Sequence, residues 1–147
     1  MSLIGGILIA ILFALAGLHF YWGLGGRWPG TDDESLRLVV VGTQRGAMPG
    51  FIPSALVAGA LAAAAAIVWA RHSPIMTSGF GWIVTAGYVV LILVFALRGL
   101  APYITPVFEY ARGAPFFEMN RLYYSPLCLL IAAGLIANAP FFRAPAP

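Results

Sequence analysis

Four long apolar stretches constrain this chain more than any other feature of its sequence. They cover residues 3–24, 51–70, 80–98 and 125–142. They contain no aspartate, glutamate or lysine, and their only arginine is Arg98, at the end of the third. A helix rises about 1.5 Å per residue, so roughly 20 residues cross the ~30 Å hydrocarbon core of a membrane. We therefore expect residues 1–147 to form one all-α domain, a polytopic membrane protein built as a four-transmembrane-helix bundle.

The composition also indicates a membrane protein. Hydrophobic residues make up 61% of the 147 residues and charged residues 9%, whereas soluble globular domains carry about 25% charged residues. All the basic side chains are arginines scattered along the chain, so no clustered basic face is expected for a nucleic acid. Cys128 is the single cysteine, so no internal disulfide or zinc site is encoded, and no cofactor motif is recognisable.

The first apolar stretch is expected to remain as a span and not to be removed as a signal peptide. Ala14, Leu15 and Ala16 resemble a small-residue cleavage site. However, no arginine or lysine precedes the stretch, and it continues to Leu24, which is longer than the usual apolar core of a signal peptide.

Small residues repeat at four-residue spacing in three of the stretches, which places each set on one helix face. These sets are Gly6, Ala10 and Ala14; Ala55, Gly59 and Ala63; and Ala133 with Ala137. Small faces let helix backbones approach closely in lipid. We expect them to pack inside the bundle, and a homo-oligomer or a contact with another membrane protein is the alternative.

The arginines predict the orientation in the membrane. Six flank or occupy the first and third connections: Arg27, Arg37, Arg45, Arg98, Arg112 and Arg121. Only Arg71 and Arg143 lie on the side of the termini. Because cytoplasmic loops carry an excess of basic residues, we expect both connections in the cytoplasm and both termini on the same, outer side.

His19 is the only ionisable side chain inside the first stretch, and Trp22 lies three residues later on the same helical face. A neutral imidazole suits a metal or haem ligand or an acid/base group, and polar residues in spans often mark function. The alternative is a structural histidine bonded to a neighbouring helix or a lipid headgroup. No companion at metal-ligand spacing accompanies His19.

A second polar cluster precedes the fourth stretch and includes Asn120, Arg121, Tyr124 and Ser125. Arginine with amide and phenol groups could hold a polar headgroup or a small anion. The alternative is a salt-bridged loop that ties the third and fourth helices together. Arg98 is expected to end the third helix and to extend to the membrane surface.

Three segments resemble signatures of a family of small bacterial four-helix membrane proteins classed as a domain of unknown function. They are His19–Gly26 with Trp28 and Pro29, Leu97–Gly99, and Tyr124–Leu129. The resemblance implies a multi-pass protein of the bacterial inner membrane and supplies no established activity. It implies that His19, Trp22, Arg98, Tyr124 and Ser125 form a shared site. Relatives usually carry an aspartate at the position of Asn120.

These observations predict a binding protein more than a transporter or an enzyme. No carboxylate or basic group other than His19 lies deep in a span, which argues against a proton relay, a pump or an ion-coupled transporter. We expect a non-catalytic accessory subunit, or a binder of lipid or a small molecule at the loop-side interface. The alternative is an enzyme acting on a lipid-like or quinone-like substrate, with His19 as acid/base or metal ligand and Arg98 or Arg121 binding an anionic group.

Overall fold

The computed structural model describes residues 1–139 and contains helices and loops, with no strand in that part of the chain. Four helices are long and apolar enough to cross a membrane, as predicted. These are α1 (Leu3–Gly23), α3 (Phe51–Ala70), α4 (Gly81–Ile104) and the helical segment Pro115–Ala137. The last is made of α5 (Pro115–Met119), the π-helical turn η3 (Asn120–Tyr124) and α6 (Ser125–Ala137).

Two spans have different ends from those expected. Helix α4 continues through Pro102 to Ile104, beyond the predicted end at residue 98. A proline inside a helix removes one hydrogen bond, here the bond to the carbonyl of Arg98, and the helix tolerates that single loss. The fourth span begins at Pro115, not at residue 125, and α6 ends at Ala137. Residues 140–142 of the predicted span lie outside the described residues.

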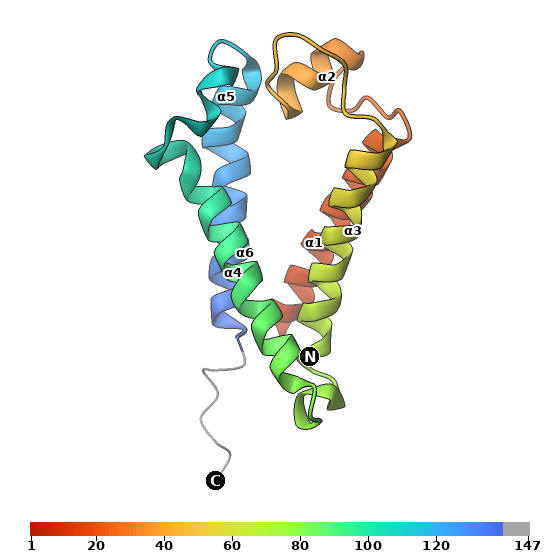
Figure 1. The fold of residues 1–147 in the computed structure, drawn as a ribbon, viewed down its shortest axis with the longest axis vertical. Helices are drawn as coiled ribbons and strands as arrows, with labels where there is room; N and C mark the ends of the chain where they lie inside the picture. The colour runs from red at the N-terminus through yellow and green to blue at the C-terminus, as the bar shows by residue number, and fades with distance from the viewer. Residues whose placement is uncertain (140–147) are drawn as a thin grey trace.

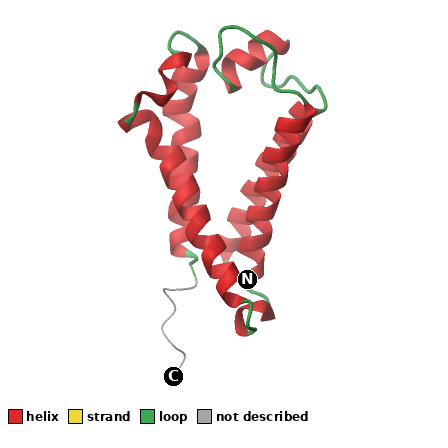
Figure 2. Cartoon of the chain, viewed as in Figure 1, coloured by secondary structure: helices red, strands yellow, loops and turns green. Residues whose placement is uncertain are grey.

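The helices form two antiparallel pairs, α1 with α3 and α4 with α6, which are arranged as a V (Figure 1). The pairs meet at the end of the molecule where the chain begins and diverge toward the opposite end, where α2 (Asp33–Val40) and α5 lie. Figure 2 shows that the loops gather at the two ends of these helices. The first and third connections therefore share one end, which we call the loop end.

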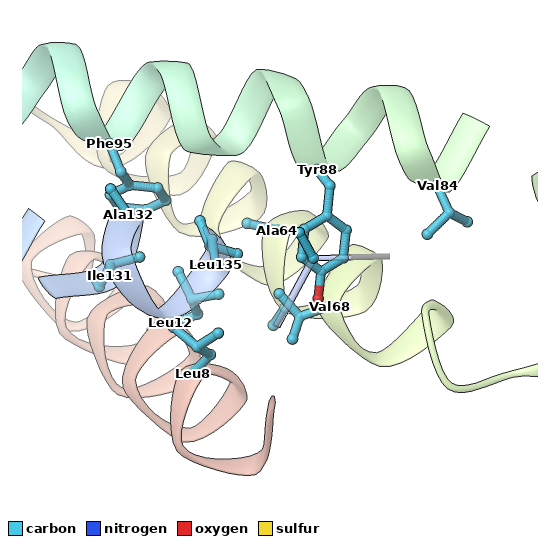
Figure 3. Packing of buried hydrophobic residues seen from close by; sticks show 12 residues of the cluster. Leu8, Leu12, Ala64, Val68, Val84, Tyr88, Phe95, Ile131, Ala132 and Leu135 are labelled. Carbon is cyan, nitrogen blue, oxygen red and sulfur yellow. The ribbon is translucent and has the colours of Figure 1, made fainter. Parts of the chain in front are cut away.

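The hydrophobic core lies mainly in the narrow half of the V, and Figure 3 shows the packing of its buried side chains. All four long helices contribute to it, with Leu12 from α1, Val68 from α3, Tyr88 from α4 and Leu135 from α6, each fully buried. Burial of apolar side chains does not drive association in lipid, so close packing must hold these helices together. The tightly packed half of the molecule is therefore the half that contains the start of α1 and the end of α6.

A polar network closes the same narrow end. Asn138, which follows α6, donates from Nδ2 to the hydroxyl of Tyr88 at 2.8 Å and accepts from Ser2 Oγ at 2.7 Å. Arg71, at the end of α3, donates to the carbonyl of Asn138, which satisfies a group left free at the α6 terminus. These bonds bring the start of α1 and the ends of α3 and α6 together.

The small-residue stripes do not all face the bundle interior. Six of the eight residues are exposed on the outer surface: Ala10, Ala14, Gly59, Ala63, Ala133 and Ala137. The prediction that they pack within the bundle is wrong for these six, because the helices associate through other positions. Gly99 of α4 packs against Leu129, and Ala64 and Ala65 of α3 lie in the core.

The short helix α2 is formed by strong local signals at the loop end. The carboxylate of Asp32 accepts from the backbone N–H of Ser35 at 2.8 Å and caps the helix. This hydrogen bond is the main reason that the pKa of Asp32 lies below its ordinary value. Leu36 is buried, and the buried Arg37 donates to the carbonyl of Thr43.

Helix α2 also bridges the two helix pairs. It follows α1 in the chain, yet the hydroxyl of Tyr124 donates to the carbonyl of Val39 at 3.2 Å and that of Tyr110 to Val41 at 3.0 Å. Gly42 ends the helix with φ of +84°, and a Cβ there would lie 2.6 Å from Phe116. Gly42 therefore supplies both a left-handed turn and a close contact with the second pair.

Candidate functional site

A cavity of about 270 Å³ lies between the two helix pairs in the loop half of the molecule. It begins where the core ends, because Phe95 and Ile131 belong both to the core and to the cavity wall. Its other apolar walls come from both helix pairs and from α2 and α5: Leu15, Leu18, Val57, Leu61, Val40, Phe116 and Leu127. The side chains of His19, Trp22, Arg98, Tyr124 and Cys128 complete the lining.

Arg98 is half-buried and turns toward Asn120 and Ser125, and the prediction that it ends its helix is wrong. It precedes the end of α4 by six residues, or about 9 Å of helix. Its Nη2 donates to Oδ1 of Asn120 at 2.7 Å and its Nη1 to Oγ of Ser125 at 3.4 Å. The guanidinium also lies over the ring of Phe108, with 4.8 Å from Cζ to the ring centroid.

Asn120 and Ser125 support Arg98 from behind and do not line the cavity. Both side chains are fully buried, and Oγ of Ser125 donates to Oδ1 of Asn120 at 3.4 Å. They stand at the two ends of the π-helical turn, where the backbone N–H of Ser125 bonds to the carbonyl of Asn120. Nδ2 of Asn120 is buried and has no acceptor among the described residues. Such wide turns often occur at functional sites.

No carboxylate neutralises Arg98 in the part of the chain that the structure describes. No acidic side chain of the described residues lines the cavity. The two ion pairs between acids and arginines in this part of the chain are Arg27 with Asp33 and Arg112 with Glu109. Both pairs are exposed and lie away from the cavity, and the hydrogen bond from Arg112 lowers the pKa of Glu109. Arg98 therefore presents a full positive charge to a largely apolar cavity.

His19 contributes a hydrogen-bond acceptor to the cavity wall. Its Nδ1 lies 2.8 Å from the carbonyl oxygen of Leu15, which can only accept, so Nδ1 carries the proton. In the neutral ring Nε2 is then the acceptor. Its ring meets that of Trp22 edge to face at 5.0 Å, and Nε1 of Trp22 donates to the carbonyl of Trp28 at 2.7 Å. Trp22 therefore offers the cavity an apolar face.

The cavity adjoins a second, smaller one of about 200 Å³ between α1, α3 and the segment after α2. His19, Trp22, Val40 and Val57 line both. Within residues 1–139 no group of three or more histidine, cysteine, aspartate or glutamate side chains could hold a metal ion. His19 and Cys128 are the only two side chains of these types that line the larger cavity.

The structure brings together six of the seven candidate residues. His19, Trp22, Arg98 and Tyr124 line the cavity, and Asn120 and Ser125 hold Arg98. Arg121 does not join them, since its exposed guanidinium lies outside, near the rings of Tyr103 and Phe117.

The cavity residues that the sequence did not predict are of two kinds: some had a signal in the sequence, and others had none. Cys128 follows Tyr124 by four residues, and this spacing places both on one helix face and could have revealed it. Val40 and Phe116 carried no such signal, because they reach the cavity only through the folding of the loop end.

These features define a four-helix integral membrane protein with an apolar, arginine-bearing cavity between two helix pairs. The chain belongs to a family described as "Protein of unknown function (DUF3995)", whose model matches residues 12–135. No curated protein and no solved structure matches it.

Proposed function

We propose that this protein is a non-catalytic membrane protein that binds a small amphiphilic molecule in the cavity between its helix pairs. The observation that supports this proposal is the lining of the cavity, which is apolar on every helix and carries one uncompensated cation, Arg98. Binding pockets for small molecules typically combine apolar walls with a few polar groups that fix the orientation of the ligand.

The size of the cavity sets the scale of the ligand. A volume of about 270 Å³ holds roughly nine water-sized groups of ~30 Å³ each. This suits a polar head with a short apolar tail, or the head and first part of a lipid chain. Arg98 lies about 9 Å in from the loop end of α4, close to the depth at which headgroups meet hydrocarbon.

The location and the role as a subunit belong to the same proposal. We infer that the loop end faces the cytoplasm of a bacterial cell and the termini the outer side of its inner membrane. Six arginines gather at or near the loop end, whereas Arg71 is the one arginine at the narrow end among the described residues. A molecule bound in a protein without catalytic machinery is passed on or sensed by another component. An accessory role beside a membrane partner fits this arrangement.

Native mass spectrometry after gentle extraction from the membrane tests the binding. Val57 lines both cavities, whereas its exposed neighbour Leu56 lines neither. We expect a bound molecule on the wild type and on Leu56→Trp, and its loss from Val57→Trp, whose indole would occupy the cavity. An empty wild type, or a Val57→Trp variant that keeps the molecule, would contradict the proposal.

One observation favours a second function, a membrane enzyme that uses His19 as acid/base on a lipid-like or quinone-like substrate. The hydrogen bond to Leu15 fixes Nδ1 as the donor, which leaves Nε2 of the neutral ring free to accept a proton. A bound molecule whose mass changes during incubation with the wild type, but not with His19→Gln, would favour this function over simple binding.

A further inference from the structure

We infer that the molecule held in this cavity carries an anionic head, a carboxylate or a phosphate, and that this head pairs with Arg98. The inference rests on the proposed binding function and names the chemistry of the ligand. The observations that support it are the surroundings of one guanidinium group.

The first observation is the charge balance around Arg98. A guanidinium has five N–H donors, and the structure gives this one two acceptors, Asn120 and Ser125, which are both neutral. No described carboxylate pairs with it. A charged side chain that faces an apolar cavity is costly unless it is paired. An anionic ligand supplies the missing counter-charge, whereas a cationic ligand would be repelled.

The second observation is that Arg98 is held in place before any ligand arrives. Oδ1 of Asn120 and Oγ of Ser125 bind its nitrogens from fully buried positions, and Phe108 covers one face of its plane. A planar guanidinium fixed in this way can give two parallel hydrogen bonds to one carboxylate or phosphate. A fixed donor also lowers the entropy lost on binding.

The third observation is a second donor without an acceptor. Nδ2 of Asn120 belongs to the same amide that binds Arg98, is buried, and has no partner among residues 1–139. Rotating this amide by half a turn would break two hydrogen bonds, because its oxygen already accepts from Arg98 and from Ser125. The buried groups behind Arg98 therefore have more donors than acceptors, and they supply no negative charge that balances the guanidinium.

Quenching of Trp22 fluorescence measures the preference for an anion. Trp22 lines the cavity, so a variant with Trp28, Trp69 and Trp82 replaced by Phe reports on ligands there. The protein is placed in zwitterionic phosphatidylcholine nanodiscs and titrated with terminally brominated decanoate, the matching decanol and the matching decyl phosphate. We expect one or both anions to bind roughly ten- to a hundredfold more tightly than the alcohol. The tighter anion identifies the head as carboxylate or phosphate.

Three variants assign this preference to Arg98. Arg98→Met should remove it and leave binding of the alcohol, whereas Arg121→Met removes the same charge outside the cavity and should keep it. Should Arg98→Met fail to fold, Asn120→Asp gives the second test. It places a carboxylate beside the guanidinium, where the amide oxygen lies at 2.7 Å, and should abolish the preference with Arg98 still present.

The outcomes separate this inference from the proposed function. Equal binding of decanol and both anions by the wild type would overturn the anionic head and leave the binding function intact. An anion preference that survives Arg98→Met, or that survives Asn120→Asp where Arg98→Met does not fold, would overturn the role of Arg98. Quenching by none of the three probes would contradict both the inference and the proposed function.

Discussion

At the scale of single residues, Arg98 shows how position decides the role of a charged side chain. An arginine near the end of a span usually extends to the headgroups, and that expectation follows from sequence. Here α4 continues past it to Ile104, and Asn120 and Ser125 offer buried acceptors on the neighbouring segment. The guanidinium therefore turns inward, where it can act on a ligand.

Gly99, the residue after Arg98, allows α4 and α6 to pack closely where Arg98 meets Asn120 and Ser125. A Cβ on Gly99 would lie 2.7 Å from Cγ of Leu129, so α4 and α6 approach closely at that position. We expect Gly99→Ala to lower the free energy of unfolding by about 1–3 kcal/mol, because the added methyl forces the helices apart. Gly17→Ala is the matched control, since a Cβ at Gly17 meets nothing within 4 Å. Unfolding in mixed micelles measures both, and equal stabilities would contradict the close approach.

At the scale of elements, the four spans could be predicted from the sequence because membrane thickness fixes the length of an apolar helix. The loop end could not be predicted in this way. Helix α2 has eight residues and a polar first turn, so no long apolar pattern marks it. The extension of α4 through Pro102 and the π-helical turn before α6 depend on tertiary packing. These three elements place Val40, Arg98 and Tyr124 around the cavity, so the sequence alone does not predict its shape.

The order of α2 depends on its cap, and this gives a pH dependence. The hydrogen bond from Ser35 lowers the pKa of Asp32 below 3.8, so the cap stabilises the helix above that value and is lost as pH falls through the lowered pKa. We expect the protection of α2 amides in hydrogen exchange, corrected for intrinsic rates, to stay constant from neutral pH to about pH 5. Asp32→Ala should lose protection at neutral pH.

Glu34→Ala is the control for this prediction, because it removes a charge from the same turn and no cap bond. Equal loss of protection in the two variants would show that charge, and not the cap, orders the helix.

At the scale of the whole molecule, the packed core and the candidate binding site occupy different halves of the V. The narrow half holds the core and the network around Asn138, and the wide half holds the cavity and Arg98 with its partners Asn120 and Ser125. The exposed small-residue stripes cover the outer faces of the same helices. A homo-oligomer or a partner that packs there stays a prediction, and it would leave the cavity between the pairs accessible.

This division predicts that the loop end can move while the narrow end stays fixed. Beyond the packing at Gly42, hydrogen bonds from Tyr110 and Tyr124 join α2 to the second pair, and each such bond contributes about 0.5–1.5 kcal/mol. We expect the double variant Tyr110→Phe and Tyr124→Phe to broaden the distribution of distances between spin labels at Phe20 and Leu100. Pulsed electron paramagnetic resonance measures this distribution in a Cys128→Ser background. Both label sites are exposed, on α1 and α4 near the loop end.

Labels at Ile4 and Ile83, which are exposed near the narrow end of the same two helices, provide the control. Their distance should stay unchanged in the double variant, because the core residues Leu12, Val68 and Tyr88 hold that end together. Broadening at both ends would show that the α2 bridge supports the whole bundle. An unchanged loop end would show that side-chain packing alone, including the contact of Gly42 with Phe116, fixes the cavity. Broadening confined to the loop end would mean that the cavity can open for its ligand while the core stays intact.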